Sequence, residues 1–145
     1  MTLLLLGDIM KNIDKKYFGM LNKLVENPAI YLMAKNGGLD FLFYDLEHGL
    51  ITMRTMHDLV LFGNNIGMPT FIRVGELSRK EISNALDCGA TGVMVPMIET
   101  REQAEKLVKW SKYPGMGQRS YSSGANTNYG SSGGHEKNIL KINQE

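Results

Sequence analysis

Short apolar runs alternate with longer amphipathic stretches along most of this sequence. Four runs have the length and the aromatic or β-branched content of buried strands, and they cover 20–25, 41–44, 70–74 and 92–95. Between and after them, apolar residues recur at helical spacing, and these segments cover 27–36, 52–66, 79–87, 101–110 and 136–145. Regular alternation of strand and helix predicts right-handed βαβ units and a parallel sheet.

Polar residues mark the helix starts. Ser78 and Thr100 are good N-caps, and Glu81 and Gln103 follow them by three positions, which is the spacing of a capping box. We therefore predict capping boxes at both sites. The helix after Thr100 has a predicted buried stripe, made of Ala104, Leu107, Val108 and Trp110.

The length of the chain limits the fold class. About four βα units fit into 145 residues, whereas a closed eight-unit barrel typically needs roughly 250 residues. The sequence therefore predicts a single α/β domain over 1–145, either a small open sheet or about half of a (β/α)8 barrel of the TIM type. Residues 113–134 are rich in Gly, Ser and Asn, which predicts a long loop of the kind found at active sites.

Composition and charge narrow the possible partners. The formal net charge is +1 with Lys and Arg scattered, so we expect no nucleic-acid or membrane partner. The apolar run Leu3–Leu6 is too short to span a bilayer and lacks the flanks of a signal peptide, so we interpret it as a strand or extended start. The single cysteine, Cys88, excludes an internal disulfide and favours a reducing, cytoplasmic location.

Ionisable residues gather where two predicted strands end. Asp45, Glu47 and His48 follow the run 41–44, and Arg73 lies at the end of the next strand. The carboxyl ends of parallel strands meet at one edge of a sheet, where ligands bind. A histidine can act as a base near neutral pH, carboxylates can hold a metal or its waters, and arginine can clamp a carboxylate or enolate. Helix capping and an ordinary loop role remain open as the alternative.

Six sequence blocks, in this order, resemble the HpcH/HpaI aldolase/citrate lyase family. They are most similar to its metal-dependent class II 2-oxo-acid aldolases, such as 2-dehydro-3-deoxyglucarate aldolase and 4-hydroxy-2-oxoheptanedioate aldolase. The blocks are Lys23-Leu-Val-Glu-Asn-Pro-Ala-Ile, Gly38-Leu-Asp-Phe-Leu-Phe-Tyr-Asp-Leu-Glu-His-Gly, Pro69-Thr-Phe-Ile-Arg-Val, Leu86-Asp-Cys-Gly-Ala, Val95-Pro-Met-Ile-Glu-Thr and Tyr113-Pro-Gly-Met-Gly-Gln-Arg.

The resemblance implies a fold and a reaction. The fold is a modified (β/α)8 barrel, of which this chain corresponds to the N-terminal half. The reaction is carbon–carbon lyase chemistry, in which a 2-oxo-3-deoxy (4-hydroxy-2-oxo) acid is cleaved to pyruvate and an aldehyde with Mg²⁺, Mn²⁺ or Co²⁺. A homo-oligomer with its active site near a subunit interface is also implied.

The resemblance also assigns roles to individual residues. His48 falls on the family's base, Arg73 on the residue that binds the pyruvyl oxygens and stabilises the enolate, and Asp87 on the acid that orients the histidine, often from a neighbouring subunit. Asp45 and Glu47 fall on carboxylates near the metal, acting through its bound waters. The direct metal ligands are expected beyond residue 145, since the chain aligns with the family up to the helix before them.

The chain by itself is therefore predicted to be inactive. Two alternatives stay open from the sequence. One is a non-catalytic binding or oligomerisation fragment of the same ancestry. The other is a flavodoxin-like open sheet that binds a phosphorylated ligand at the Gly-rich loop.

Overall fold

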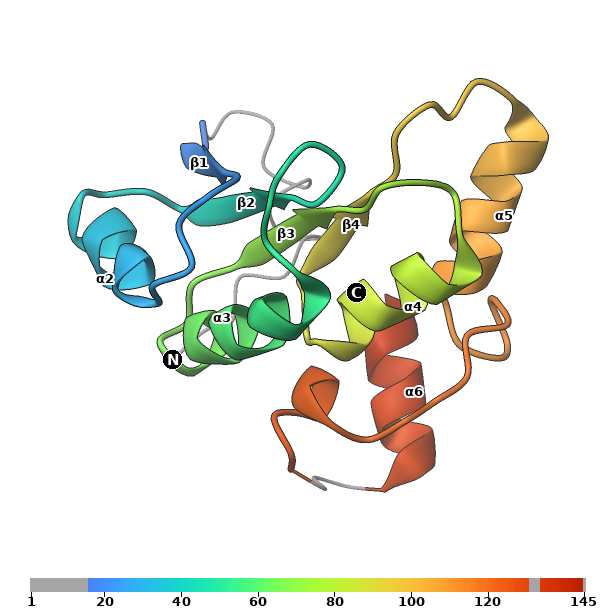
Figure 1. Cartoon of the computed structure of the whole chain (residues 1–145). Coiled ribbons are helices and arrows are strands. Elements are labelled where there is room, and N and C mark those ends of the chain that lie inside the picture. The colour runs from blue at the N-terminus through green and yellow to red at the C-terminus, as the bar shows by residue number, and fades with distance from the viewer. Residues whose placement is uncertain (1–15, 131–133, 145) are drawn as a thin grey trace.

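The secondary structure alternates as the hydrophobic pattern predicts. In a computed structural model of the chain, residues 16–130 and 134–144 are described (Figure 1). The predicted extended segment Leu3–Leu6 lies outside these residues. The strands are β1 (Gly19–Asn22), β2 (Phe41–Asp45), β3 (Thr70–Arg73) and β4 (Gly92–Met94). The helices are α2 (Ala29–Asn36), α3 (Met53–Asn65), α4 (Arg79–Asp87), α5 (Arg101–Ser111) and α6 (His135–Gln144), with a 3₁₀ turn η1 (Ala125–Thr127).

The four strands form one parallel sheet in the order β1-β2-β3-β4. Each crossover therefore steps to the next strand in the same direction, as in a barrel. A flavodoxin-like sheet would instead reverse direction at a switch point. Within the described residues, the strand order thus contradicts the open-sheet alternative and agrees with four successive units of a barrel wall.

One face of the sheet packs against helices. Leu42 and Tyr44 of β2 and Ile72 of β3 alternate along their strands and are all buried. From α2, Tyr31 shares a 2.9 Å hydrogen bond with the hydroxyl of Thr70 and stacks on the Tyr44 ring with centroids 6.0 Å apart. Burying large apolar side chains here supplies the main stabilisation of the domain.

The other face of the sheet is apolar and open. Leu21, Phe43 and Phe71 lie at alternating positions on it, and Leu21 is 54% exposed. The same two-residue alternation places Asp45 and Arg73 at the C-terminal end of this face, one step beyond Phe43 and Phe71. In a closed barrel such a face would line the interior.

Several element ends differ from prediction for local reasons. β1 stops at Asn22 rather than continuing to residue 25, because the Asn22 side chain accepts from the backbone N–H of Leu24 and Val25 and turns the chain. At Thr100 and Gln103 the predicted capping box is formed. At Ser78 it is not, because Glu81 instead accepts from the backbone N–H groups of Gly75 and Glu76.

The predicted buried stripe of α5 is only partly formed. Leu107 and Trp110 are half-buried and pack against the core, whereas Ala104 and Val108 are exposed. The helix packs beside α4 at the end of the sheet (Figure 1). None of the helices among the described residues is long and apolar enough to cross a membrane.

The Gly-rich segment after α5 is a long connection, as predicted, and it carries buried anchors. Tyr113, Arg119 and Ala125 are buried, and the carbonyl of Ala125 lies close against Gly89 at the start of the turn into β4. This part of the segment therefore lies at the N-terminal end of the strands. It does not border the strand ends that carry Asp45 and Arg73 in the same chain.

Candidate active site

Asp45 is the centre of the cluster at the strand ends. Its side chain is fully buried. One carboxylate oxygen, Oδ1, accepts from the backbone N–H of Glu47 at 3.0 Å and of His48 at 3.1 Å, and from Arg73 Nε at 2.9 Å. The other oxygen, Oδ2, accepts from Arg73 Nη2 at 2.5 Å and lies 3.2 Å from Lys23 Nζ. The carboxylate is thus saturated with donors.

The turn after β2 is shaped by the same carboxylate. Bonds from Asp45 to the two following N–H groups fold the chain back over the strand end. Gly49 completes the turn, because a Cβ there would lie 2.0 Å from the carbonyl oxygen of Asp45. The sequence Asp-Leu-Glu-His-Gly therefore presents Glu47 and His48 at a fixed place beside β3.

The electrostatics of the cluster keep Asp45 charged. Hydrogen bonds from Arg73, with further donors from His48 and Lys23, hold the pKa of Asp45 well below its usual range despite burial. The same contact with Asp45 raises the pKa of Arg73. The Asp45 carboxylate therefore stays ionised near neutral pH, and it orients the Arg73 guanidinium by its two hydrogen bonds.

This shift predicts acid sensitivity of the fold. The pKa of Asp45 is lower in the native state than the roughly 3.9 of an unfolded Asp. As the pH decreases below about 4, the unfolded chain therefore binds a proton before the native state does, and the free energy of unfolding decreases. Asp45→Asn should lower the free energy of unfolding at pH 7 and flatten its decline between pH 5 and pH 2. Urea unfolding followed by circular dichroism measures both. Glu102→Gln is the matched control, because that carboxylate on α5 is solvent-exposed and lies outside the cluster. Equal slopes for wild type and Asp45→Asn would contradict the assignment.

Arg73 retains donors for a ligand. Its Nε and Nη2 bond to Asp45, and its Nη1 lies 3.2 Å from Glu47 Oε2. A guanidinium has five N–H bonds, so one N–H on Nη1 and one on Nη2 are left over by these contacts. These two N–H bonds can donate to the oxygens of a carboxylate or of a 2-oxo acid.

Glu47 links Arg73 to His48. Its Oε2 lies 3.2 Å from Arg73 Nη1 and 3.7 Å from His48 Nε2. The His48 side chain is 62% exposed, so a ligand held by Arg73 can reach its imidazole. The structure therefore brings together Asp45, Glu47, His48 and Arg73, as the strand-end pattern predicts.

Lys23 is a member of the cluster that the sequence reasoning missed. It follows β1, whose Asn22 pairs in register with Tyr44, so Lys23 comes level with Asp45 on the neighbouring strand. The signal was present in the sequence as a polar residue at a strand end. It was hidden because the predicted first strand extended two residues beyond Lys23.

Asp87 is not brought to the cluster within the chain. It ends α4, and α4 runs from the C-terminal end of β3 back toward the N-terminal end of β4. Its carboxylate pairs with Arg119 Nη2 at 2.5 Å, and no bond between Asp87 and His48 is found in the described residues. A role for Asp87 at His48 thus requires a second subunit.

The described residues do not form a metal centre. No group of three or more His, Cys, Asp and Glu side chains able to hold a metal ion occurs among residues 16–130 and 134–144. The donors around Asp45 already occupy both of its oxygens. Glu47 alone in the cluster offers a partly exposed carboxylate, and one such group does not bind Mg²⁺ or Mn²⁺ without further ligands.

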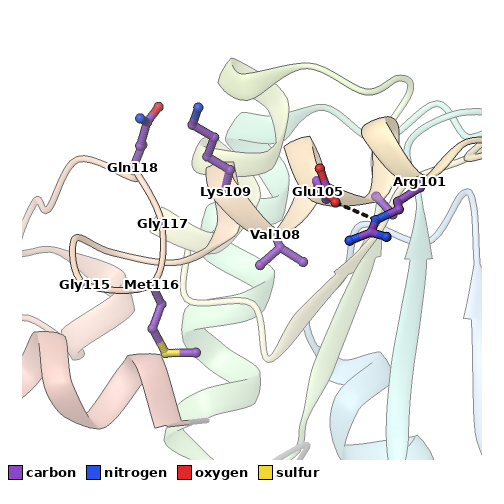
Figure 2. Close-up of a pocket in the computed structure, with 9 residues that line it drawn as sticks. Arg101, Glu105, Val108, Lys109, Gly115, Met116, Gly117 and Gln118 are labelled. Atoms are coloured by element: carbon purple, nitrogen blue, oxygen red, sulfur yellow. Dashed lines mark hydrogen bonds and ion pairs between the residues drawn. The ribbon is translucent and has the colours of Figure 1, made fainter.

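A hollow on the outside of α5 is separate from this cluster. Figure 2 shows it between the helix and the turn 115–118, with Arg101 paired to Glu105 at 2.8 Å. Val108 and Met116 are exposed there. Its lining contains no histidine and none of the strand-end residues, so we assign it no part in the chemistry.

A parallel sheet of sequential strands with an arginine–carboxylate–histidine cluster at its C-terminal edge defines this chain as part of a barrel of the (β/α)8 class. The HpcH/HpaI aldolase/citrate lyase family matches residues 20–140. The chain belongs to this family, and its four βα units correspond to the N-terminal part of the family's barrel.

Similar proteins agree on the family and on the extent of the match. The chain is 34% identical over 99 residues to 4-hydroxy-4-methyl-2-oxoglutarate aldolase of Hapsidospora irregularis. The aligned region covers 68% of this chain and 37% of that protein. The chain is 36% identical over 88 residues to 2-keto-3-deoxy-L-rhamnonate aldolase of Salmonella gallinarum, covering 60% and 33%. The crystal structure of an HpcH/HpaI aldolase from Desulfitobacterium hafniense superimposes with a TM-score of 0.86 at 28% identity, covering 94% and 53%. The chain thus spans about a third to a half of these relatives.

Proposed function

We propose that this chain is part of a carbon–carbon lyase that cleaves a 4-hydroxy-2-oxo acid to pyruvate and an aldehyde. The observation that carries the proposal is the Arg73 guanidinium, which buried Asp45 orients and which Glu47 links to an exposed His48. Asp45 accepts all the hydrogen bonds that it can, whereas Arg73 still has two N–H bonds that these contacts leave over. Arg73 can therefore bind an anionic ligand. Several similar proteins named as aldolases of 2-oxo acids support the same reaction class.

The proposed roles follow from the reaction's electron flow. Arg73 binds the carboxylate and 2-oxo oxygens of the substrate and stabilises the negative charge that develops on the 2-oxo oxygen. His48 removes the proton of the C4 hydroxyl, directly or through one water. The C3–C4 bond then breaks, C4 leaves as the aldehyde, and the electron pair forms the C2–C3 enolate. Protonation of the enolate at C3 gives pyruvate.

We propose class II metal dependence, with Mg²⁺, Mn²⁺ or Co²⁺, for the complete barrel only. The described residues of this chain lack the ligands, so the direct ligands are assigned to the second half of the barrel. Glu47 is better suited than Asp45 to contact metal-bound water, because its carboxylate is partly exposed while that of Asp45 is saturated.

The test uses a barrel-completed protein, defined as residues 1–145 joined to a downstream half-barrel. That half is taken from 2-keto-3-deoxy-L-rhamnonate aldolase of Salmonella gallinarum. Coupled lactate dehydrogenase measures pyruvate release from a panel of 4-hydroxy-2-oxo acids with Mg²⁺ or Mn²⁺. We expect turnover that His48→Gln abolishes. Turnover unaffected by His48→Gln would reject the proposed base, and a folded but inert protein would support the non-catalytic alternative.

We propose that the enzyme is a homo-oligomer in which Asp87 supports His48 of a partner subunit. The Asp87 side chain is 36% exposed, so a group from another subunit can reach it. The free thiol of Cys88 is compatible with a cytoplasmic location, which we propose for the protein.

Substitution of Asp87 should affect catalysis rather than substrate binding. In the barrel-completed protein, Asp87→Asn should lower kcat by about 10-fold to 100-fold while KM changes little, because a group that orients a catalytic residue acts on the base. Steady-state kinetics of pyruvate release measures both. Asp58→Asn, an exposed helix position on α3, should leave kcat unchanged. An Asp87→Asn enzyme with wild-type kcat would reject this role.

A further inference from the structure

Arg119 is a buried charge in a segment that the composition predicts to be a loop. It is only 2% exposed. Burying a guanidinium is costly unless it is paired and hydrogen-bonded. Its Nη2 donates to Asp87 Oδ1 at 2.5 Å, and its guanidinium lies over the Tyr113 ring, 4.6 Å from the centroid. The pairing with Asp87 and the ring contact offset part of this cost, while the buried Nε of Arg119 has no hydrogen-bond partner among the described residues.

Hydrogen bonds from two parts of the chain hold the Arg119 backbone and its neighbour Tyr113 in place. Its backbone N–H donates to the carbonyl of Lys112 at 2.9 Å. Tyr113 is fully buried, its backbone N–H donates to Asn143 Oδ1 at 2.8 Å, and its hydroxyl accepts from Asn126 Nδ2 at 3.2 Å. These contacts come from α6 and from the connection after α5. These contacts hold the Arg119 backbone and the Tyr113 ring against which the Arg119 guanidinium lies.

Asp87 needs such a partner to stay in place. An acid at the C-terminal end of a helix is disfavoured by the helix dipole, and the last turn of α4 contains no basic residue. Arg119 supplies the missing positive charge from outside the helix. Among the described residues no hydrogen bond reaches Oδ2, so that oxygen is left to accept a donor from beyond the chain.

We propose that Arg119 is a positioning residue for the reaction: it holds Asp87 by Oδ1 so that Oδ2 faces the His48 imidazole of a partner subunit. The inference rests on the proposed function, in which Asp87 supports that histidine. Arg119 itself does not touch substrate. It acts through Asp87, as a hydrogen-bonding partner acts through a ligand or base that it orients.

The test is a mutant cycle in the barrel-completed protein. Arg119→Gln, Asp87→Asn and the double variant are compared by kcat and KM for pyruvate release, with melting temperature and oligomeric state recorded for each. We expect Arg119→Gln to lower kcat by about 10-fold with KM within about twofold, and the double variant to be no worse than Asp87→Asn alone. Arg119→Lys should recover part of kcat, because it restores the charge. Arg101→Gln is the control, since it removes an exposed arginine–glutamate pair from α5.

The outcomes separate this inference from the proposed function. If Asp87→Asn lowers kcat and Arg119→Gln does not, Arg119 is structural only, and the inference fails while the function stands. If the two losses multiply in the double variant, Arg119 does not act through Asp87, and the inference also fails. If Asp87→Asn has no effect, the role of Asp87 and the inference fail together. Should Arg119→Gln not fold, Arg119→Lys becomes the test, and wild-type kcat in that variant would overturn the inference.

Discussion

The 145-residue chain alone is expected to release no measurable pyruvate, whereas the barrel-completed protein should turn over many times per minute. Two observations motivate this difference. The described residues contain no metal-binding group of side chains, and the sheet face that ends in Asp45 and Arg73 is open, with Leu21 and Met94 exposed on or beside it. Without the other wall of a barrel, water reaches the cluster and weakens its electrostatic interactions.

The measurement is pyruvate release at equal protein concentration, with and without Mg²⁺ or Mn²⁺. Size-exclusion chromatography accompanies it. Within residues 16–130 and 134–144, the outer edges of β1 and β4 pair with no further strand and one sheet face is apolar, and both features favour association of the isolated chain. His48→Gln in the barrel-completed protein controls for contaminating lyase. Robust metal-dependent turnover by the isolated chain would show that the ligands are misplaced, and Glu145, which lies outside the described residues, would be the first to reconsider.

The second large effect is expected at Arg73. In the barrel-completed protein, Arg73→Lys should lower kcat/KM by about 10²-fold to 10³-fold, the range found when one donor to a developing oxyanion is lost. Lysine keeps the positive charge beside buried Asp45. Its single nitrogen cannot, however, make two parallel bonds to Asp45 and also donate two hydrogen bonds to the substrate.

The matched control for this substitution is Arg79→Lys, at an exposed position at the start of α4. Melting temperatures of the two variants show how much of any loss is unfolding. Removing the charge altogether, as in Arg73→Ala, would leave the Asp45 carboxylate buried beside Lys23 alone. Removing one partner of an ion pair around a buried carboxylate destabilises the fold, so that variant tests stability rather than catalysis. A kcat/KM for Arg73→Lys within threefold of the control would contradict the proposed role of the Arg73 guanidinium.

The local pattern of the sequence determined the elements and most of the cluster. Apolar runs ending in Asp45 and Arg73 predict two buried parallel strands, and the strand ends of a parallel sheet meet at one edge whatever the rest of the fold. Thr100 and Gln103 predict their capping box because all the bonds involved lie within four residues. The family resemblance added the roles, which periodicity could not supply.

Only the tertiary structure decided between an open sheet and a barrel wall, because strand order depends on which strands pair across long separations and not on local spacing. It also showed that only Leu107 and Trp110 of the predicted α5 stripe pack against the core, and that Lys23 reaches Asp45 from the end of the neighbouring strand. Arg119 and Asp87 are 32 residues apart, and the composition around Arg119 indicates only a loop. Their pairing depends on how α4, α6 and the connection after α5 pack together, and that packing is set by long-range burial that no local pattern encodes.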